Sequence, residues 1–86
     1  MSGLGSLTTS AIRLLDYLAA ERGLEWSRRW AVADSCNMGD RSAFRAVQGL
    51  RMWGLVEVEH RGRVVWIRAT PLGIDLMAAR YKTEAA

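Results

Sequence analysis

The 86-residue sequence is poor in the residue types that build disulfides, metal sites and hydrolytic active sites. With one cysteine and one histidine, it offers neither an internal disulfide nor a credible metal site. Nucleophile–histidine–acid sets and phosphate-binding glycine loops are missing too, so we expect neither an enzyme nor a cofactor. No signal peptide or apolar run of membrane length is present, and we therefore expect a cytoplasmic protein.

Lysine is almost absent as well, since eleven of the twelve basic residues are arginine, and the net charge is +3. Arginine is always charged, and its planar guanidinium matches phosphates and guanine edges. The bias fits nucleic-acid binding, although codon usage in a GC-rich genome explains it equally well. Half of the residues are apolar. We predict one domain over 7–82, between a flexible tail at 1–6 and a frayed end at 83–86.

The stretch 32–50 has the spacing of two short helices joined by a tight turn. Asn37 stands where the chain must reverse, because asparagine tolerates the left-handed conformation of helix ends, and Met38 can fill the gap between the helices. From Asp40 onward, at about 100° per residue, one arc is apolar. Its members are Ala43, Ala46, Val47, Leu50 and Trp53. The opposite arc carries hydrogen-bond donors and no acid, as expected of a helix in the DNA major groove. It comprises Arg41, Ser42, Arg45, Gln48 and Gly49.

These residues resemble winged helix-turn-helix regulators of the MarR type. The resemblance rests on V-A-x-x-C-N-M-x-x-x-S-A-x-R-x-V-x-x-L at 32–50, on W-G-L-V at 53–56 and on R-A-T-P-L-G at 68–73. It implies an α+β, mainly α, winged helix-turn-helix fold with a three-helix core, a β-hairpin wing and a C-terminal helix. It also implies a dimeric, repressor-type transcriptional regulator that binds double-stranded DNA sequence-specifically. Helix 40–53 would read the major groove, and wing 56–69 would contact the backbone.

Caps and stops predict the elements before this unit. A threonine at 8–9 caps a first helix that stops at Gly23. The segment 24–26 could form a short strand that pairs with the wing. Ser27 is placed to cap the next helix, over 28–36.

Alternation of apolar and polar residues predicts the hairpin and its register. A two-residue loop at Arg61-Gly62 places apolar pairs on the inner face. These pairs are Val58 with Val65 and Val56 with Ile67. The outer pairs are Glu57 with Trp66 and Glu59 with Val64.

Three residues in or directly after helix 40–53 have separate predicted roles. Gly54 is predicted as its C-terminal cap. Gly49 costs up to about 1 kcal/mol relative to alanine in a helix interior, which indicates close approach of DNA or of another helix. Phe44 stands at the edge of the apolar arc. We interpret it as an edge-of-core residue, and contact with thymine methyl groups is the alternative.

Eight side chains are candidates for DNA contact: Arg28, Arg29, Arg41, Ser42, Arg45, Gln48, Arg61 and Arg63. The four on helix 40–53 would meet base edges or phosphates, and the other four would bind the DNA backbone. Arg45 is the first candidate for base reading, because the family's helix often carries a basic residue there. For the pair at 28–29 and for the wing tip, a solvated charged surface is the alternative.

The C-terminal helix, opened by Thr70-Pro71, shows two apolar faces. One comprises Leu72, Leu76 and Ala79. The other comprises Ile74, Met77, Ala78 and Tyr81. One face can pack on the domain, and we predict that the second, through Ile74, Met77, Ala78 and Tyr81, forms a homodimer contact. A fully buried helix is the alternative.

The four tryptophans keep other functions open. Trp66 is predicted on the outer face of the wing, where it could contact a protein partner. A winged-helix module for protein–protein interaction, or an accessory protein of replication or recombination, is therefore the alternative to a regulator.

Overall fold

The protein is described from a computed structural model, which covers residues 7–85 and the side chains of residues 7–82. The predicted 1–6 tail lies outside the described residues. The elements are α1 (Thr9–Tyr17), the π-helical turn η2 (Leu18–Arg22), β1 (Ser27–Arg28), α2 (Arg29–Ser35), α3 (Asp40–Met52), β2 (Val56–Arg61), β3 (Val64–Ala69) and α4 (Pro71–Ala85). The strands form an antiparallel sheet in the order β1-β3-β2.

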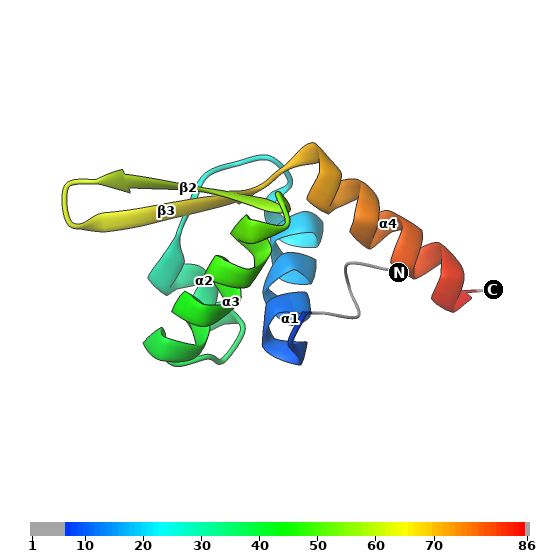
Figure 1. Cartoon of the computed structure of the whole chain (residues 1–86), viewed down its shortest axis with the longest axis horizontal. Helices are drawn as coiled ribbons and strands as arrows, with labels where there is room; N and C mark the ends of the chain where they lie inside the picture. Colours follow the sequence, from blue (N-terminus) through cyan, green and yellow to red (C-terminus); the bar gives the residue numbers. More distant parts are fainter. Residues whose placement is uncertain (1–6, 86) are drawn as a thin grey trace.

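Figure 1 shows α1, α2 and α3 grouped together, with the β2–β3 hairpin extending at one end and α4 at the other. The predicted three-helix core with a hairpin wing and a C-terminal helix is confirmed. None of the described helices is long and apolar enough to cross a membrane.

The first helix begins as its sequence predicts. The Thr8 hydroxyl accepts a hydrogen bond from the Ala11 amide at 3.1 Å, which satisfies one of the amides left open at a helix start. The leucines of α1 and η2 at 14, 15 and 18 are fully buried. The helical path ends at Gly23, whose φ is 58°. The predicted extent of this helix, to Arg22, is thereby confirmed.

The turn between α2 and α3 has the predicted conformation. Asn37 has a φ of 59°, and the Met38 amide donates to the Ala33 carbonyl at 2.8 Å. The Met38 side chain packs against the hydrophobic core. At the far end of α3, Gly54 has a φ of 71°, which confirms it as the glycine that terminates the helix.

The apolar arc of α3 points into the core, except at its end. Ala43, Ala46, Val47 and Leu50 are buried. Trp53 is 46% exposed, so its predicted place in the buried arc is wrong. Trp53 is the residue at the C-terminal cap of α3, where the helical path ends.

The predictions around residue 27 are wrong in detail. The strand that pairs with the wing is β1, which lies C-terminal to the predicted 24–26 segment, and Ser27 pairs with Ile67. Ser27 does not cap α2, since Arg28 takes the cap position without a side-chain hydrogen bond. The buried Ser27 hydroxyl instead accepts a hydrogen bond from Arg22 Nε at 2.8 Å. Arg22 lies on η2, and helix-capping patterns do not predict a hydrogen bond from a side chain of the preceding element.

The hairpin register also differs from the prediction. The loop is Gly62-Arg63, and Arg61 pairs with Val64. The other pairs are Val56 with Ala69, Glu57 with Arg68, Val58 with Ile67, Glu59 with Trp66 and His60 with Val65. Gly62 has a φ of 62° at the first loop position, which glycine adopts easily and arginine does not. Because the shift is two residues, every side chain keeps its predicted face.

The last helix starts at its predicted cap. The Thr70 hydroxyl accepts from the Gly73 amide at 3.1 Å and donates to the Gly54 carbonyl at 2.7 Å, which ties α4 to the end of α3. The helix continues to Ala85, beyond the predicted end at 82. Fraying of its last residues stays a prediction.

The two helical glycines have different surroundings. A Cβ atom on Gly49 would meet only Leu7 Cδ2, at 3.9 Å. The predicted close approach of another helix to Gly49 is therefore wrong for the described residues. A Cβ atom on Gly73 would lie 2.3 Å from the Leu55 carbonyl oxygen. The close backbone approach is therefore at the start of α4.

The predicted dimer face of α4 is largely used within the domain. Met77 is 1% exposed and belongs to the core, and Ile74 is partly buried against that core. Their placement on a free surface is therefore wrong. Tyr81, 49% exposed, donates a hydrogen bond to Asp16 of α1, and Ala78 is exposed. α4 packs against α1 and η2 through Ile74 and Met77, which were predicted to contact a second subunit.

Candidate nucleic-acid interface

The outer arc of α3 is fully presented to solvent. Arg41, Ser42, Arg45 and Gln48 are all exposed, as their spacing predicts. Within residues 7–82 the ion pairs are Arg22–Glu25, Arg61–Glu59 and Arg68–Glu57. Arg41 and Arg45 take part in none of them. This arc therefore offers two guanidinium groups whose charge no carboxylate of the described chain neutralises.

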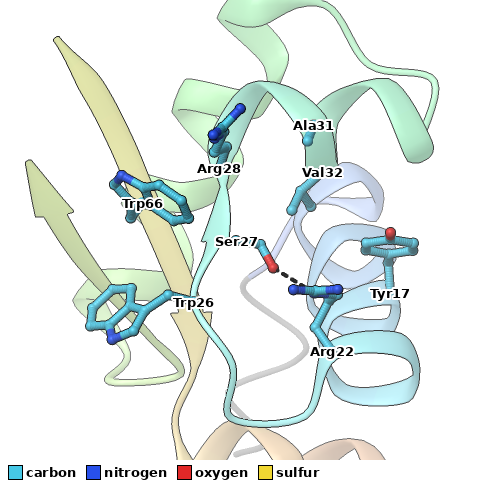
Figure 2. A pocket seen from close by; sticks show the side chains of 8 residues that line it. All are labelled: Tyr17, Arg22, Trp26, Ser27, Arg28, Ala31, Val32 and Trp66. Carbon is cyan, nitrogen blue, oxygen red and sulfur yellow. Dashed lines mark hydrogen bonds between the residues drawn. The ribbon is translucent and has the colours of Figure 1, made fainter. Parts of the chain in front are cut away.

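Arg28 and Arg29 are neighbours in sequence but extend to opposite sides of the domain. The Arg29 guanidinium carbon lies 5.8 Å from the centre of the Phe44 ring, beside α3. The Arg28 guanidinium carbon lies 5.4 Å from the Trp66 ring, on the outer face of the sheet. Figure 2 shows Arg28 next to Trp66, with Trp26 further along that face. Only Arg29 shares a surface with α3.

The two arginines of the wing tip are separated in the same way. Arg63 is exposed and lines a hollow together with Arg29, Trp30 and Asp40, between the wing tip and the helix-turn-helix. Arg61 folds back along the wing instead, away from that hollow. We call six polar residues on the α3 side the front surface: Arg29, Arg41, Ser42, Arg45, Gln48 and Arg63. Arg29 is half-buried and the other five are exposed, and the exposed Asp40 borders them in the hollow.

The outer face of the sheet carries a second, self-contained cluster, which we call the back face: Trp26, Arg28, Arg61, Trp66 and Arg68. Arg61 lies 4.9 Å from the Trp66 ring and 5.6 Å from the Trp26 ring, and Arg68 lies 4.5 Å from the Trp26 ring. Each such contact contributes about 0.5–1 kcal/mol at an exposed site. The back face therefore holds its cations by stacking.

Carboxylates neutralise two of the three back-face arginines. Arg61 donates to Glu59 at 3.1 Å, and Arg68 donates to Glu57 at 3.2 Å. The hydrogen bond from Arg61 holds the pKa of Glu59 below its ordinary value. A pocket of about 260 Å³ adjoins this face, with Trp66 and Trp26 on one side and Arg22 and Tyr17 on the other (Figure 2). The back face is thus far less available to a phosphate than the front surface.

Further side chains border the front surface and were not among the eight candidates for DNA contact. Arg51 and His60 line a hollow between α3 and the hairpin, together with Phe44 and Gln48. Trp30, on α2, is 57% exposed. Arg51 could have been found, because it lies on the wing side of the α3 arc at helical spacing. Alternation along the strand also places His60 on the face of Val58.

The single cysteine takes no part in this surface. Cys36 is buried between α1 and the end of α2, and its burial raises the pKa of the thiol. A protonated, buried thiol is unreactive. Among the described residues, no group of three or more His, Cys, Asp or Glu could hold a metal ion.

Comparison with known proteins identifies the fold. No family model and no curated protein matches the chain. Among solved structures, MepR, a transcription regulator of the multidrug efflux pump MepA from Staphylococcus aureus, is similar with a TM-score of 0.78 and 18% identity, covering 93% of this chain and 59% of MepR. A double mutant of Lactococcus lactis ZitR is similar with a TM-score of 0.73 and 18% identity, covering 88% of this chain and 51% of ZitR.

A possible transcriptional regulatory protein from Mycobacterium bovis, solved as a fragment, is similar with a TM-score of 0.71 and 23% identity, covering 91% of this chain and 80% of the fragment. The chain thus spans about half to three fifths of the length of ZitR and MepR. Its fold is the winged helix-turn-helix fold of MarR-like regulators, as the sequence resemblance predicts.

Proposed function

We propose that this protein binds double-stranded DNA sequence-specifically as a dimeric, repressor-type transcriptional regulator in the cytoplasm. The observation that carries the proposal is the outer arc of α3, which presents unpaired arginines and no acid on a winged-helix fold. The similarity to S. aureus MepR, which has been solved in complex with DNA, supports the proposal (TM-score 0.75, 18% identity, covering 90% of this chain and 64% of that one).

The proposed mechanism is occupancy of the operator by two recognition helices. In each subunit α3 enters the major groove, where Arg45 and Arg41 can fork onto guanine edges and Gln48 onto adenine. Arg29 and Arg63 lie beside α3 and the wing tip, where they would neutralise backbone phosphates. A bound dimer then blocks access of other proteins to the same stretch of DNA.

The geometry reduces the set of proposed DNA contacts. Arg28 and Arg61 stack on the tryptophans of the back face, and Arg61 is also paired with Glu59. Both guanidinium groups lie on the outer face of the sheet, away from α3, whereas Arg29, which also stacks on an aromatic ring, lies beside α3. We therefore keep Arg29 and Arg63 as the backbone anchors and leave Arg28 and Arg61 out.

A second copy of the chain is the proposed partner of α4. Leu72 is 58% exposed and Ala78 is exposed, and both lie on the solvent-facing side of the helix. These two residues, in place of Met77 and Ile74, would make the contact across a two-fold axis, whereas Tyr81 lies about half a turn from Leu72 around the helix and is bonded to Asp16 of α1. A two-fold dimer places its recognition helices on two half-sites about one turn of DNA apart.

Selection of bound duplexes from a random pool, followed by sequencing, tests both parts of the proposal. We expect an enriched motif made of two inverted half-sites, with centres about 10 base pairs apart or a multiple of that distance. An enriched single half-site would overturn the dimer. If no motif is enriched at any salt concentration, sequence-specific binding is wrong.

A role in protein docking was suggested by the tryptophan on the outer wing face. In the structure, Arg28 and Arg61 both stack on Trp66. The indole that motivated this alternative is thus already partnered within the domain.

A further inference from the structure

Phe44 is an aromatic side chain in the first half of α3 that lies half outside the protein. It is 48% exposed, although the apolar residues next to it on one side of the helix, Ala43 and Val47, are buried. The next residue is Arg45, and Gln48 follows one turn later, so the ring stands among the side chains of the front surface. Phe44 is thus more exposed than the partly buried apolar residues that pack against the core, such as Val58 and Val65.

The ring is held in place by two other elements. The Arg29 guanidinium lies 5.8 Å from the ring centre, close enough for a cation–π contact. Phe44 also lines the hollow between α3 and the hairpin with Val47, Val58 and Val65. One part of the ring therefore faces apolar side chains, and the rest faces the solvent beside Arg45.

Only one group in the major groove can make an apolar contact with a phenyl ring. Base edges display hydrogen-bond donors and acceptors there, and the C5-methyl group of thymine is the apolar exception. A phenyl ring has no hydrogen-bonding atom, so its favourable contact in the groove is with that methyl group. Arg29, stacked on the ring, would meet the backbone phosphate beside the same base.

We propose that Phe44 is a specificity-determining residue that reads the C5-methyl group of a thymine. Arg29 is its positioning residue, because its guanidinium holds the ring and can bind the neighbouring phosphate. The inference rests on the proposed function, since it requires α3 to lie in the major groove. It replaces the edge-of-core interpretation of Phe44.

Replacing thymine with deoxyuridine tests the proposal, because uracil lacks only this methyl group. Each thymine of the selected duplex is replaced in turn, at the equivalent position of both half-sites. At one such position we expect the wild-type protein to lose about fourfold in affinity per contact, the effect of one apolar group left unburied. Phe44→Ala is expected to bind the thymine and uracil duplexes equally. Phe44→Gln, whose longer side chain still covers part of the hollow beside Val47, Val58 and Val65, provides the same test if the alanine variant is unstable.

Trp30→Ala is the matched control, because it removes another exposed aromatic ring that lies on α2. This variant should retain the full uracil effect. A wild-type protein that is indifferent to uracil at every position overturns the proposal, and so does a Phe44→Ala variant that keeps the loss. Failure of the proposed function looks different, since the pool then yields no selected duplex.

Discussion

Gly73→Ala is expected to lower the free energy of unfolding by about 3 kcal/mol, because the added methyl group cannot be accommodated without moving the backbone. Its Cβ would lie 2.3 Å from the Leu55 carbonyl oxygen and 3.1 Å from Leu15 Cδ1. The same carbonyl accepts the Thr70 amide at 3.0 Å, so a displacement of α4 would also strain its first turn. Urea unfolding followed by circular dichroism measures the difference.

Gly49→Ala is the matched control, since it adds the same methyl group to another helical glycine. Its Cβ would meet only Leu7 Cδ2, at 3.9 Å. Alanine is favoured over glycine in a helix interior by about 1 kcal/mol, so this variant should be more stable than wild type. Equal stability of the two variants would mean that α4 does not pack on Leu55 as described.

Arg45→Ala is expected to weaken binding to the selected duplex by about 1–3 kcal/mol and binding to random DNA far less. Arg45 is exposed near the centre of the outer arc of α3 and has no carboxylate partner within residues 7–82. Its guanidinium can therefore fork onto a guanine edge without first breaking an internal contact. Fluorescence anisotropy with both duplexes at one fixed salt concentration measures the two losses.

Arg45→Lys separates base reading from simple charge. Lysine keeps the positive charge but lacks the planar fork. We expect this variant to bind random DNA like wild type and to lose most of the preference for the selected duplex. If the lysine variant keeps the full preference for the selected duplex over random DNA, Arg45 contacts a phosphate and not a base.

Much of the helix-turn-helix could be predicted from the sequence because its signals are local. Helical periodicity separates the buried arc of α3 from the exposed one, and Asn37 and Gly54 mark the turns that require a positive φ. The hairpin faces were also predictable, since alternation survives a register shift of two residues. The register itself depended on which loop position takes the positive φ of Gly62.

The misses concern contacts between different helices and strands. The role of Ser27 depended on Arg22, and the burial of Met77 depended on how α4 leans on α1 and η2. The period of α4 shows two apolar faces but does not say which of them meets the domain. Only the structure answers that question, through the packing of Ile74 and the exposure of Leu72.

The sequence predicted which residue types form the candidate site, but not the face of the domain on which each arginine lies. Composition and position favour all the arginines near the helix-turn-helix and the wing tip equally. The stacking of Arg28 and Arg61 on Trp66 separates them from the front surface, and cation–π contacts between strands leave no signal in the linear sequence. This separation distinguishes the proposed DNA-binding surface from the back face.

The salt dependence of DNA binding by two double variants shows which of the two surfaces meets the phosphates. Arg29→Ala with Arg63→Ala removes two charges from the front surface, and Arg28→Ala with Arg61→Ala removes two from the back face. Each phosphate contact contributes about one unit to the slope of log affinity against log salt concentration. In the proposed dimer the front pair removes up to four phosphate contacts, two from each subunit, so we predict that it flattens this slope by about two to four units and that the back pair leaves it at the wild-type value. Equal flattening by both pairs, or a larger effect of the back pair, would contradict the assignment of the DNA-binding surface.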